Sequence, residues 1–181
     1  KPSSAASDVY KRQEVTLVTG PVAITPPPFV NVIPVKSAKD MFDAVTEHAD
    51  EQDIIIKSAA VADYTPSQVA TEKVKKKEND MSIALNQTQD ILSYLGQHKK
   101  AGQILCGFSM ETENMLENSK QKLKKKNADI IVANNLKEQG AGFGTDTNVV
   151  TMITKEQVKE LPILSKEEVA EALLDEIKQM Q

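Results

Sequence analysis

The sequence predicts an α/β domain in which a mainly parallel β-sheet is flanked by helices. Short apolar or β-branched runs alternate with segments of helical character, and this alternation is typical of parallel strands joined by helices. The runs at 53–60, 104–108 and 128–133 are almost continuously apolar, as expected for strands covered on both faces. With 181 residues, the chain is long enough for one sizeable domain with a buried core.

The first elements can be justified residue by residue. The run at 14–19 is rich in β-branched residues and ends at a Gly-Pro pair, which favours a strand followed by a turn. The run at 30–35 is also strand-like, and the proline within it indicates an edge strand or a strand end. Ser37 and Asp40 have the spacing of a capping box, so we expect a helix to begin there and to end near residue 49.

The remaining elements continue the same alternation. After the strand at 53–60 we expect a polar, lysine-rich flap at 65–78, a short strand near 81–85 and a helix near 90–98. A strand at 104–108, a helix at 113–126 and a strand at 128–133 should follow. We then expect a Gly-rich loop at 138–147, a strand at 149–154 and a final helix capped by Ser165 and Glu168.

Composition excludes several classes of protein. The net charge of −4 does not favour binding to nucleic acid through a general basic surface. The single cysteine, Cys106, excludes a disulfide framework and a cysteine-based zinc site, and it fits a reducing cytoplasm. No apolar run reaches the roughly 18 residues of a membrane-spanning helix. The usual kinase, dehydrogenase, zinc-protease and serine-hydrolase motifs are missing from the sequence.

Small and polar residues follow three of the predicted strands. In parallel sheets, ligands bind beyond the carboxyl ends of the strands. Ala59, Ala60 and Asp63 follow one strand, Phe108 ends the next, and Asn134 follows the third. Small residues allow a ligand close to the backbone, an aromatic ring can stack on a base, and a carboxylate can hold a metal or a sugar hydroxyl. Ordinary loop polarity explains any one strand end, but the convergence of three favours a ligand site.

The lysines form two clusters, at 73–77 on the predicted flap and at 120–126 on a predicted helix. Lys122 and Lys126 are four residues apart and therefore share a helix face, where like charges repel by roughly 0.2–0.5 kcal/mol. A bound polyphosphate would turn this repulsion into attraction. The alternative explanation is that lysines near a helix C-terminus are favoured by the helix dipole.

Seven short stretches, in this order along the chain, carry a family resemblance; they lie at 18–22, 59–64, 73–76, 107–112, 126–129, 133–134 and 142–148. Together they resemble phosphopantothenoylcysteine synthetase, the ligase of coenzyme A biosynthesis. The resemblance covers the chain from about residue 14 to its end. Each motif alone is weak, but the ordered set is specific. The segment at 87–92, Gln-Thr-Gln-Asp-Ile-Leu, departs from the commoner Asn-Pro-Asp-Ile form and looks like the separate synthetases of some Gram-positive bacteria.

The resemblance implies a Rossmann-like fold and a ligase that joins phosphopantothenate to cysteine. Bacterial members mostly use CTP and Mg²⁺, and they pass through an acyl-cytidylate before cysteine displaces CMP. By position, the implied nucleotide site contains Ala59, Asp63, Lys73, Gln89, Asp90, Ile91, Leu92, Phe108, Lys122 and Lys126. Ala59, Ala60 and Asn134 would face the acyl substrate, and Lys73 would be catalytic. No residue is assigned as a metal ligand.

The resemblance also implies partners. The flap would close over a site at the interface of a homodimer, and a decarboxylase could act as a separate partner protein.

Two other interpretations stay open at this point. A nucleotide-dependent oxidoreductase shares the alternating pattern, although no Gly-rich dinucleotide turn is present. A lysine-rich, non-enzymatic binding module is the other, although the net charge of −4 and the low aromatic content disfavour RNA as its ligand.

Residues 1–13 differ from the rest of the chain. They are rich in Ser and Ala and contain Arg12, the sole arginine. In the family, a strand, a Gly/Ser-rich loop and a helix precede the strand at 14–19, and residues 1–13 match none of them. We therefore expect a disordered or foreign leader at 1–13 and a synthetase domain at 14–181 that lacks its N-terminal strand, loop and helix. Such a chain should be weakly active or inactive and should have an under-filled sheet edge or core.

Overall fold

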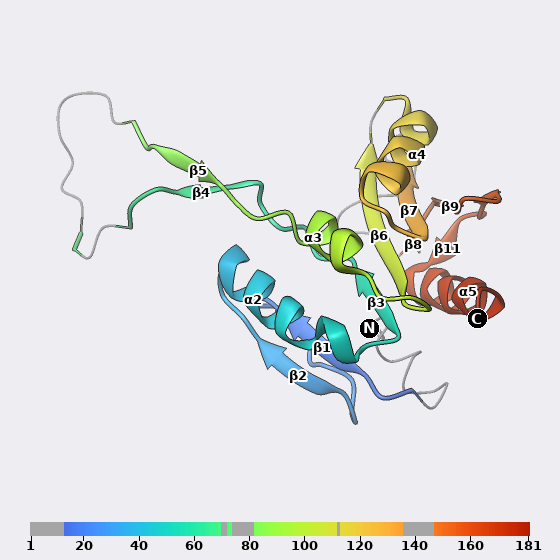
Figure 1. The fold of residues 1–181 in the computed structure, drawn as a ribbon, viewed down its shortest axis with the longest axis horizontal. Helices are drawn as coiled ribbons and strands as arrows, with labels where there is room; N and C mark the ends of the chain where they lie inside the picture. Colours follow the sequence, from blue (N-terminus) through green and yellow to red (C-terminus); the bar gives the residue numbers. More distant parts are fainter. Residues whose placement is uncertain (1–12, 70–71, 74–81, 112, 136–146) are drawn as a thin grey trace.

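A computed structural model describes residues 13–69, 72–73, 82–111, 113–135 and 147–181 (Figure 1). Its central sheet has five strands in the order β10-β9-β7-β6-β3. The strands β3 (Ile54–Lys57), β6 (Ile104–Glu111) and β7 (Ile130–Asn135) are parallel neighbours. At the other edge, β9 (Val150–Ile153) pairs antiparallel with β7, and β10 (Val158–Glu160) pairs antiparallel with β9. The prediction of an α/β fold with a mainly parallel sheet is confirmed.

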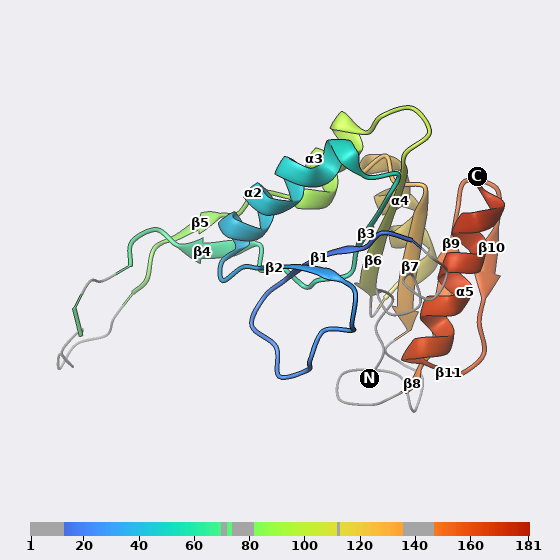
Figure 2. The ribbon, with the colours of Figure 1, turned by 90° about the horizontal axis from the view of Figure 1, so that it is seen from below.

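Helices cover both faces of this sheet, because β6 and β7 point alternate side chains to opposite sides. On one face, Ile104, Cys106, Ile130 and Val132 pack with Val169, Leu173, Leu174 and Ile177 of α5 (Lys166–Gln179). On the other, Leu105, Ile131 and Ala133 pack with Ile91, Leu92 and Leu95 of α3 (Ile91–His98) and with Leu123 of α4 (Met115–Lys125). The result is three layers, seen edge-on in Figure 2.

The helix α2 (Ala38–His48) adds partly buried side chains to the second core and continues into the short 3₁₀ helix η1 (Ala49–Glu51). Ser37 caps α2 and Ser165 caps α5, each through a complete capping box, as expected from the sequence. The helices at 90–98 and 113–126 begin one and two residues later than predicted, since Asp90 and Asn114 are their N-cap residues. Within the described part of the chain, no helix is long and apolar enough to cross a membrane.

The first two strands form a small sheet of their own. β1 (Thr16–Thr19) and β2 (Asn31–Pro34) are parallel and, among the strands that the structure describes, pair only with each other. Between β1, α2 and β3 lies a pocket lined by Leu17 and Val18 of β1, Met41 and Val45 of α2, and all four residues of β3. β3 is an edge strand that is only half buried along its length, but Ile54 and Ile56 pack against the core on one face and Ile55 against the core on the other, as expected for a strand covered on both faces.

A long arm projects from the body on the β3 side (Figures 1 and 2). β4 (Tyr64–Pro66) and β5 (Leu85–Gln87) pair antiparallel at its base. The short strand predicted near 81–85 therefore lies at 85–87, and the start of the predicted flap is a strand because it has β5 as a partner. Lys73 is exposed on the arm. Most of the predicted lysine cluster of the flap lies outside the described residues.

Two further short strands complete the C-terminal part. β8 (Thr147–Asn148) and β11 (Leu164–Ser165) pair antiparallel next to the start of α5. The strand predicted at 149–154 is β9, and it is buried throughout. Most of the Gly-rich loop predicted at 138–147 lies outside the described residues.

Candidate functional site

A pocket lies at the carboxyl end of β3 and beside Phe108 of β6, close to where the sequence predicts a ligand site. The strand β6 does not end at Phe108, as the sequence predicts, but continues to Glu111 because β7 pairs with it over that length. Its walls come from the end of β3, the base of the arm, the start of α3, β6 and the second half of α4. The lining residues are Lys57, Val61, Asp63, Gln87, Thr88, Gln89, Asp90, Ile91, Leu92, Phe108, Lys122 and Lys126. Of the residues predicted for the nucleotide site, Asp63, the segment from Gln89 to Leu92, Phe108, Lys122 and Lys126 are brought together here.

Asp90 links the start of α3 to α4. Its carboxylate accepts a hydrogen bond from the Ser93 backbone N–H at 2.9 Å, as an N-cap residue does, and it forms an ion pair with Lys126 Nζ. Burial opposes ionisation of this carboxyl, but the hydrogen bonds from Lys126 and Ser93 outweigh it, so the pKa of Asp90 is lowered. Asp90 is therefore a carboxylate that holds the Lys126 ammonium at the wall of the pocket.

Lys122 reaches the pocket from the same face of α4 as Lys126, as their spacing predicts. Its Nζ donates to the backbone carbonyl of Phe108 at 3.2 Å. A buried hydrogen bond of 2.9 Å between the hydroxyls of Ser109 and Ser119 fixes α4 against β6 at this point. The half-buried Phe108 thus lies where a flat ring could stack beside a lysine ammonium.

Lys57 is a pocket residue that the sequence pattern does not single out, because it belongs to the strand run rather than to the loop after it. Its Nζ donates to the backbone carbonyl of Ala59 at 2.7 Å. Burial lowers the pKa of Lys57, repulsion from Lys122 lowers it further, and Asp90 and Asp63 act in the opposite direction. The signal that could have found it is a charged residue at the last position of an apolar strand.

Thr88 is a second residue that sequence patterns miss. Its backbone N–H donates to the carbonyl of Asp63 at 2.8 Å, and its hydroxyl donates to the carbonyl of Ala62 at 2.6 Å. These two hydrogen bonds join the two sides of the arm at its base, and Asp63 and Thr88 form part of one wall of the pocket. A contact across this sequence distance leaves no local periodicity to detect.

The other predicted site residues lie outside the lining of this pocket. Ala59 lines the pocket between β1 and β3, and Ala60 is exposed just beyond it. Lys73 lies on the arm. Asn134, at the end of β7, accepts a hydrogen bond from the Asn148 side-chain amide at 3.0 Å. The structure thus does not gather these residues into the pocket that holds the other predicted site residues.

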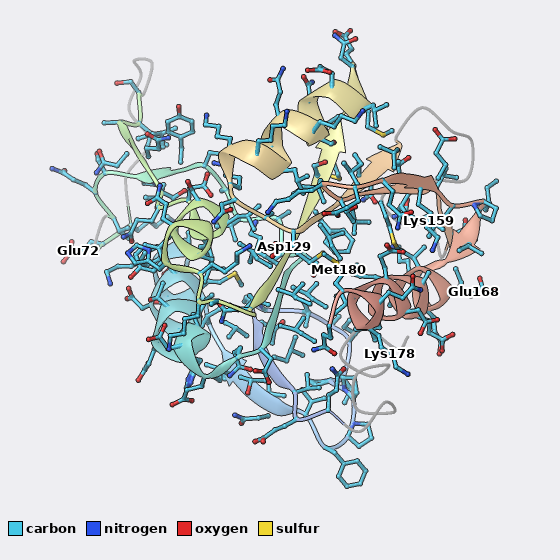
Figure 3. All side chains as sticks on the ribbon, turned by 45° about the vertical axis from the view of Figure 1, so that its right-hand side comes forward. Glu72, Asp129, Lys159, Glu168, Lys178 and Met180 are labelled. Carbon is cyan, nitrogen blue, oxygen red and sulfur yellow. The ribbon has the colours of Figure 1, made fainter. Side chains whose placement is uncertain are left out.

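The turn between α4 and β7 sets the position of Lys126. Asn127 has a positive φ of 47°, and its side-chain amide donates to the Gly96 carbonyl of α3 at 2.8 Å. Asp129, labelled in Figure 3, accepts from Lys99 Nζ at 2.7 Å and from the Leu105 N–H at 2.8 Å. The residues at 126–129 therefore hold α3, the end of α4 and β6 together through hydrogen bonds.

Chemically, the pocket suits an anion that also carries a flat ring. Three lysine side chains line it, against two carboxylates, one of which is already paired with Lys126. Among the described residues, no group of three or more His, Cys, Asp and Glu side chains could hold a metal ion. The pocket contains only a pair of carboxylates, Asp63 and Asp90, and such a set fits Mg²⁺ when a bound phosphate supplies further oxygen ligands.

The chain is similar to proteins of coenzyme A biosynthesis. It matches the family described as the DNA/pantothenate metabolism flavoprotein C-terminal domain over residues 4–180. It is 48% identical over 175 residues to the coenzyme A biosynthesis bifunctional protein CoaBC of Bacillus subtilis, covering 96% of this chain and 43% of that protein. With CoaBC of Escherichia coli, the identity is 37% over 176 residues, again covering 96% of this chain and 43% of the relative.

A solved structure supports the same relationship. The crystal structure of the C-terminal domain of CoaBC superposes with a TM-score of 0.82 at 42% identity, covering 98% of this chain and 79% of that chain. The chain spans less than half the length of the curated relatives named above. The family match includes residues 4–13, which the composition predicts to belong to a separate leader, so the division of the chain at residue 13 stays a prediction.

Proposed function

We propose, because this chain belongs to the DNA/pantothenate metabolism flavoprotein C-terminal domain family, that it carries the ligase step which joins phosphopantothenate to cysteine with CTP. Its relatives named CoaBC support a place in coenzyme A biosynthesis. The observation that carries the proposal is the pocket beyond β3 and β6, where Lys122 and Lys126 stand beside Phe108 and the Asp90 cap of α3. This family membership also favours the ligase over the oxidoreductase and the binding module.

The proposed reaction has two steps. The phosphopantothenate carboxylate attacks the α-phosphorus of CTP, and pyrophosphate leaves. The amine of cysteine then attacks the acyl carbon of the resulting acyl-cytidylate, and CMP leaves. The first step needs little proton transfer, because a carboxylate is already ionised near neutral pH. It does need neutralised phosphate charge, alignment of the two reactants and exclusion of water.

The residues of this chain would meet these needs in different ways. Lys122 and Lys126 would neutralise the phosphates, and Phe108 would stack on the base. The segment from Gln89 to Leu92, at the start of α3, would border the nucleotide. Asp63 would hold a ribose hydroxyl or contribute a ligand to Mg²⁺, which neutralises phosphate charge when it is bound. We name no further metal ligand.

The acyl substrate and the arm complete the proposal. The backbone at Ala59 and Ala60 and the amide of Asn134 would face the acyl intermediate. Lys73 would reach the phosphates when the arm closes over the site, and in a homodimer the arm would cross to the neighbouring subunit. A decarboxylase would supply the other half of the function, either as a further domain of a bifunctional protein, the description given to the CoaBC relatives, or as a separate protein.

The test is pyrophosphate release by this chain with phosphopantothenate, comparing CTP with ATP. We expect release that depends on phosphopantothenate and is faster with CTP, followed by formation of the cysteine adduct when cysteine is added. A chain that also carries the strand, loop and helix that the family resemblance predicts ahead of residue 14 should show a higher rate in the same assay. Release without phosphopantothenate dependence in both chains would contradict the ligase assignment.

A further inference from the structure

We propose that Lys57 is a phosphate-binding residue of this pocket and that it holds, together with Lys122, one anionic group of the bound nucleotide. The inference rests on the proposed function, since it names a further contact for the same ligand. Neither the resemblance of the motifs nor the order of the strand ends assigns a role to this side chain.

The first support is the position of the Lys57 ammonium. Lys57 is the last residue of β3, at the carboxyl end of the parallel sheet, and it lines the pocket. It interacts electrostatically with Lys122, Asp90 and Asp63, which come from α4, the start of α3 and the base of the arm, and all three line the same pocket. Its side chain is therefore anchored on a strand of the central sheet, and its charge lies among the charged groups that line the cavity.

The second support is unused hydrogen-bonding capacity. An ammonium group has three N–H donors. Lys57 donates to the carbonyl of Ala59, and Lys122 donates to the carbonyl of Phe108. Among the ion pairs of the described residues, Lys126 is matched with Asp90, but Lys57 and Lys122 have no carboxylate partner. Two neighbouring ammonium groups that are each held by one carbonyl leave donors for an anion.

The third support is electrostatic. Burial disfavours the charge on Lys57, and repulsion from Lys122 disfavours it further, so the pKa of this ammonium is lowered. A phosphate placed between them would replace the repulsion with two charge-assisted hydrogen bonds. The competing explanation is that Lys57 only ties down the Ala59 carbonyl. That role needs one N–H donor and no positive charge, so the two explanations can be separated.

The experiment measures the affinity of CTP and of inorganic pyrophosphate by calorimetry for this chain and for Lys57→Gln. Glutamine keeps an N–H donor but loses the charge. We expect Lys57→Gln to weaken both ligands about tenfold, as for loss of one charge-assisted hydrogen bond. We also expect the affinity of the variant to fall less steeply with ionic strength, because one charge fewer is screened. Lys178→Gln is the matched control, since Lys178 is exposed on α5 (Figure 3), and it should change neither quantity.

A second measurement uses the unaltered chain and does not depend on whether the variant folds. Acetylation of individual lysines is followed by mass spectrometry, and we expect pyrophosphate to protect Lys57 but not Lys178. Unchanged affinity and salt dependence in a folded Lys57→Gln, or equal acetylation of Lys57 with and without pyrophosphate, would overturn the inference and leave the proposed function standing. If the unaltered chain binds neither CTP nor pyrophosphate, both proposals fail.

Discussion

Close contacts at Gly96 decide where the Lys126 ammonium lies. A Cβ added to Gly96 would stand 1.8 Å from the backbone oxygen of Lys126 and 3.3 Å from Cβ of Asn127. The missing side chain lets α3 approach the end of α4 closely enough for Asn127 to donate to the Gly96 carbonyl. The same approach brings Asp90, at the start of α3, within reach of Lys126.

Gly96→Ala should therefore destabilise the protein. Alanine favours a helix by about 1 kcal/mol over glycine, but here its methyl group would overlap a backbone oxygen, which cannot move aside cheaply. We expect a net loss of about 1–3 kcal/mol in the free energy of unfolding, as for other overpacked sites. Urea denaturation, monitored by circular dichroism, measures this loss in the free energy of unfolding.

The matched control is Gly20→Ala. Nothing lies within 4 Å of a Cβ built on Gly20, so this change should alter the free energy of unfolding by less than about 0.5 kcal/mol. Equal stability of Gly96→Ala and the unaltered chain would contradict the close approach of α3 to the turn at 126–127.

Some residues of the site can be predicted from local patterns and others cannot. Lys122 and Lys126 follow from helical spacing, and Phe108 follows from its place at the end of an apolar run. Lys57 cannot be found in this way because it lies within the apolar run at 53–60, and only the structure shows that β3 ends at this residue. Thr88 escapes because its role depends on two carbonyls 25 and 26 residues earlier in the chain, which only the folded structure brings near.

At the scale of elements, the two capped helices differ in what they support. Both α2 and α5 begin with a complete capping box, at Ser37 and Ser165. The helix α5 contributes six buried residues, whereas α2 contains none. Fraying at the start of α5 should therefore disturb one face of the central sheet, while fraying of α2 should stay local.

This difference leads to a paired prediction for Ser165→Ala and Ser37→Ala. Each variant loses the side-chain acceptor of its cap, which typically costs about 1 kcal/mol. We expect the full loss of about 1 kcal/mol in global unfolding for Ser165→Ala and a smaller loss for Ser37→Ala. Thermal unfolding by calorimetry compares the two, and a larger loss for Ser37→Ala would show that α2 belongs to the cooperative core.

The elements that local patterns predict are the long and periodic ones. The helices and the strands β6, β7 and β9 follow from capping residues and apolar runs. The strands β4, β8, β10 and β11 are only two or three residues long, and they exist because a partner strand lies opposite them. β3 is shorter than its apolar run, and among the described strands it has β6 alone as a neighbour in the sheet. Pairing and edge position are tertiary properties, and they leave little trace in so few residues.

At the scale of the whole molecule, burial is uneven. The strands β6, β7 and β9 contribute buried residues to both cores, between α5 on one face and α3 and α4 on the other. No residue within β1 or β2 is buried, and these strands hydrogen-bond to each other rather than to the five-stranded sheet. The pocket between β1 and β3 separates the two sheets.

Amide hydrogen exchange should reveal this division. We expect the amides of β6, β7 and β9 to exchange only through global unfolding, because both of their faces are packed. The amides of β1 and β2 should exchange through a smaller opening that leaves the central sheet intact, since few buried contacts hold that unit. In native-state exchange, the free energy of exchange falls as denaturant is added. This fall should be less steep for β1 and β2 than for β6, because the smaller opening exposes less surface. Equal free energies of exchange and equal slopes in the two sheets would show that they unfold as one body.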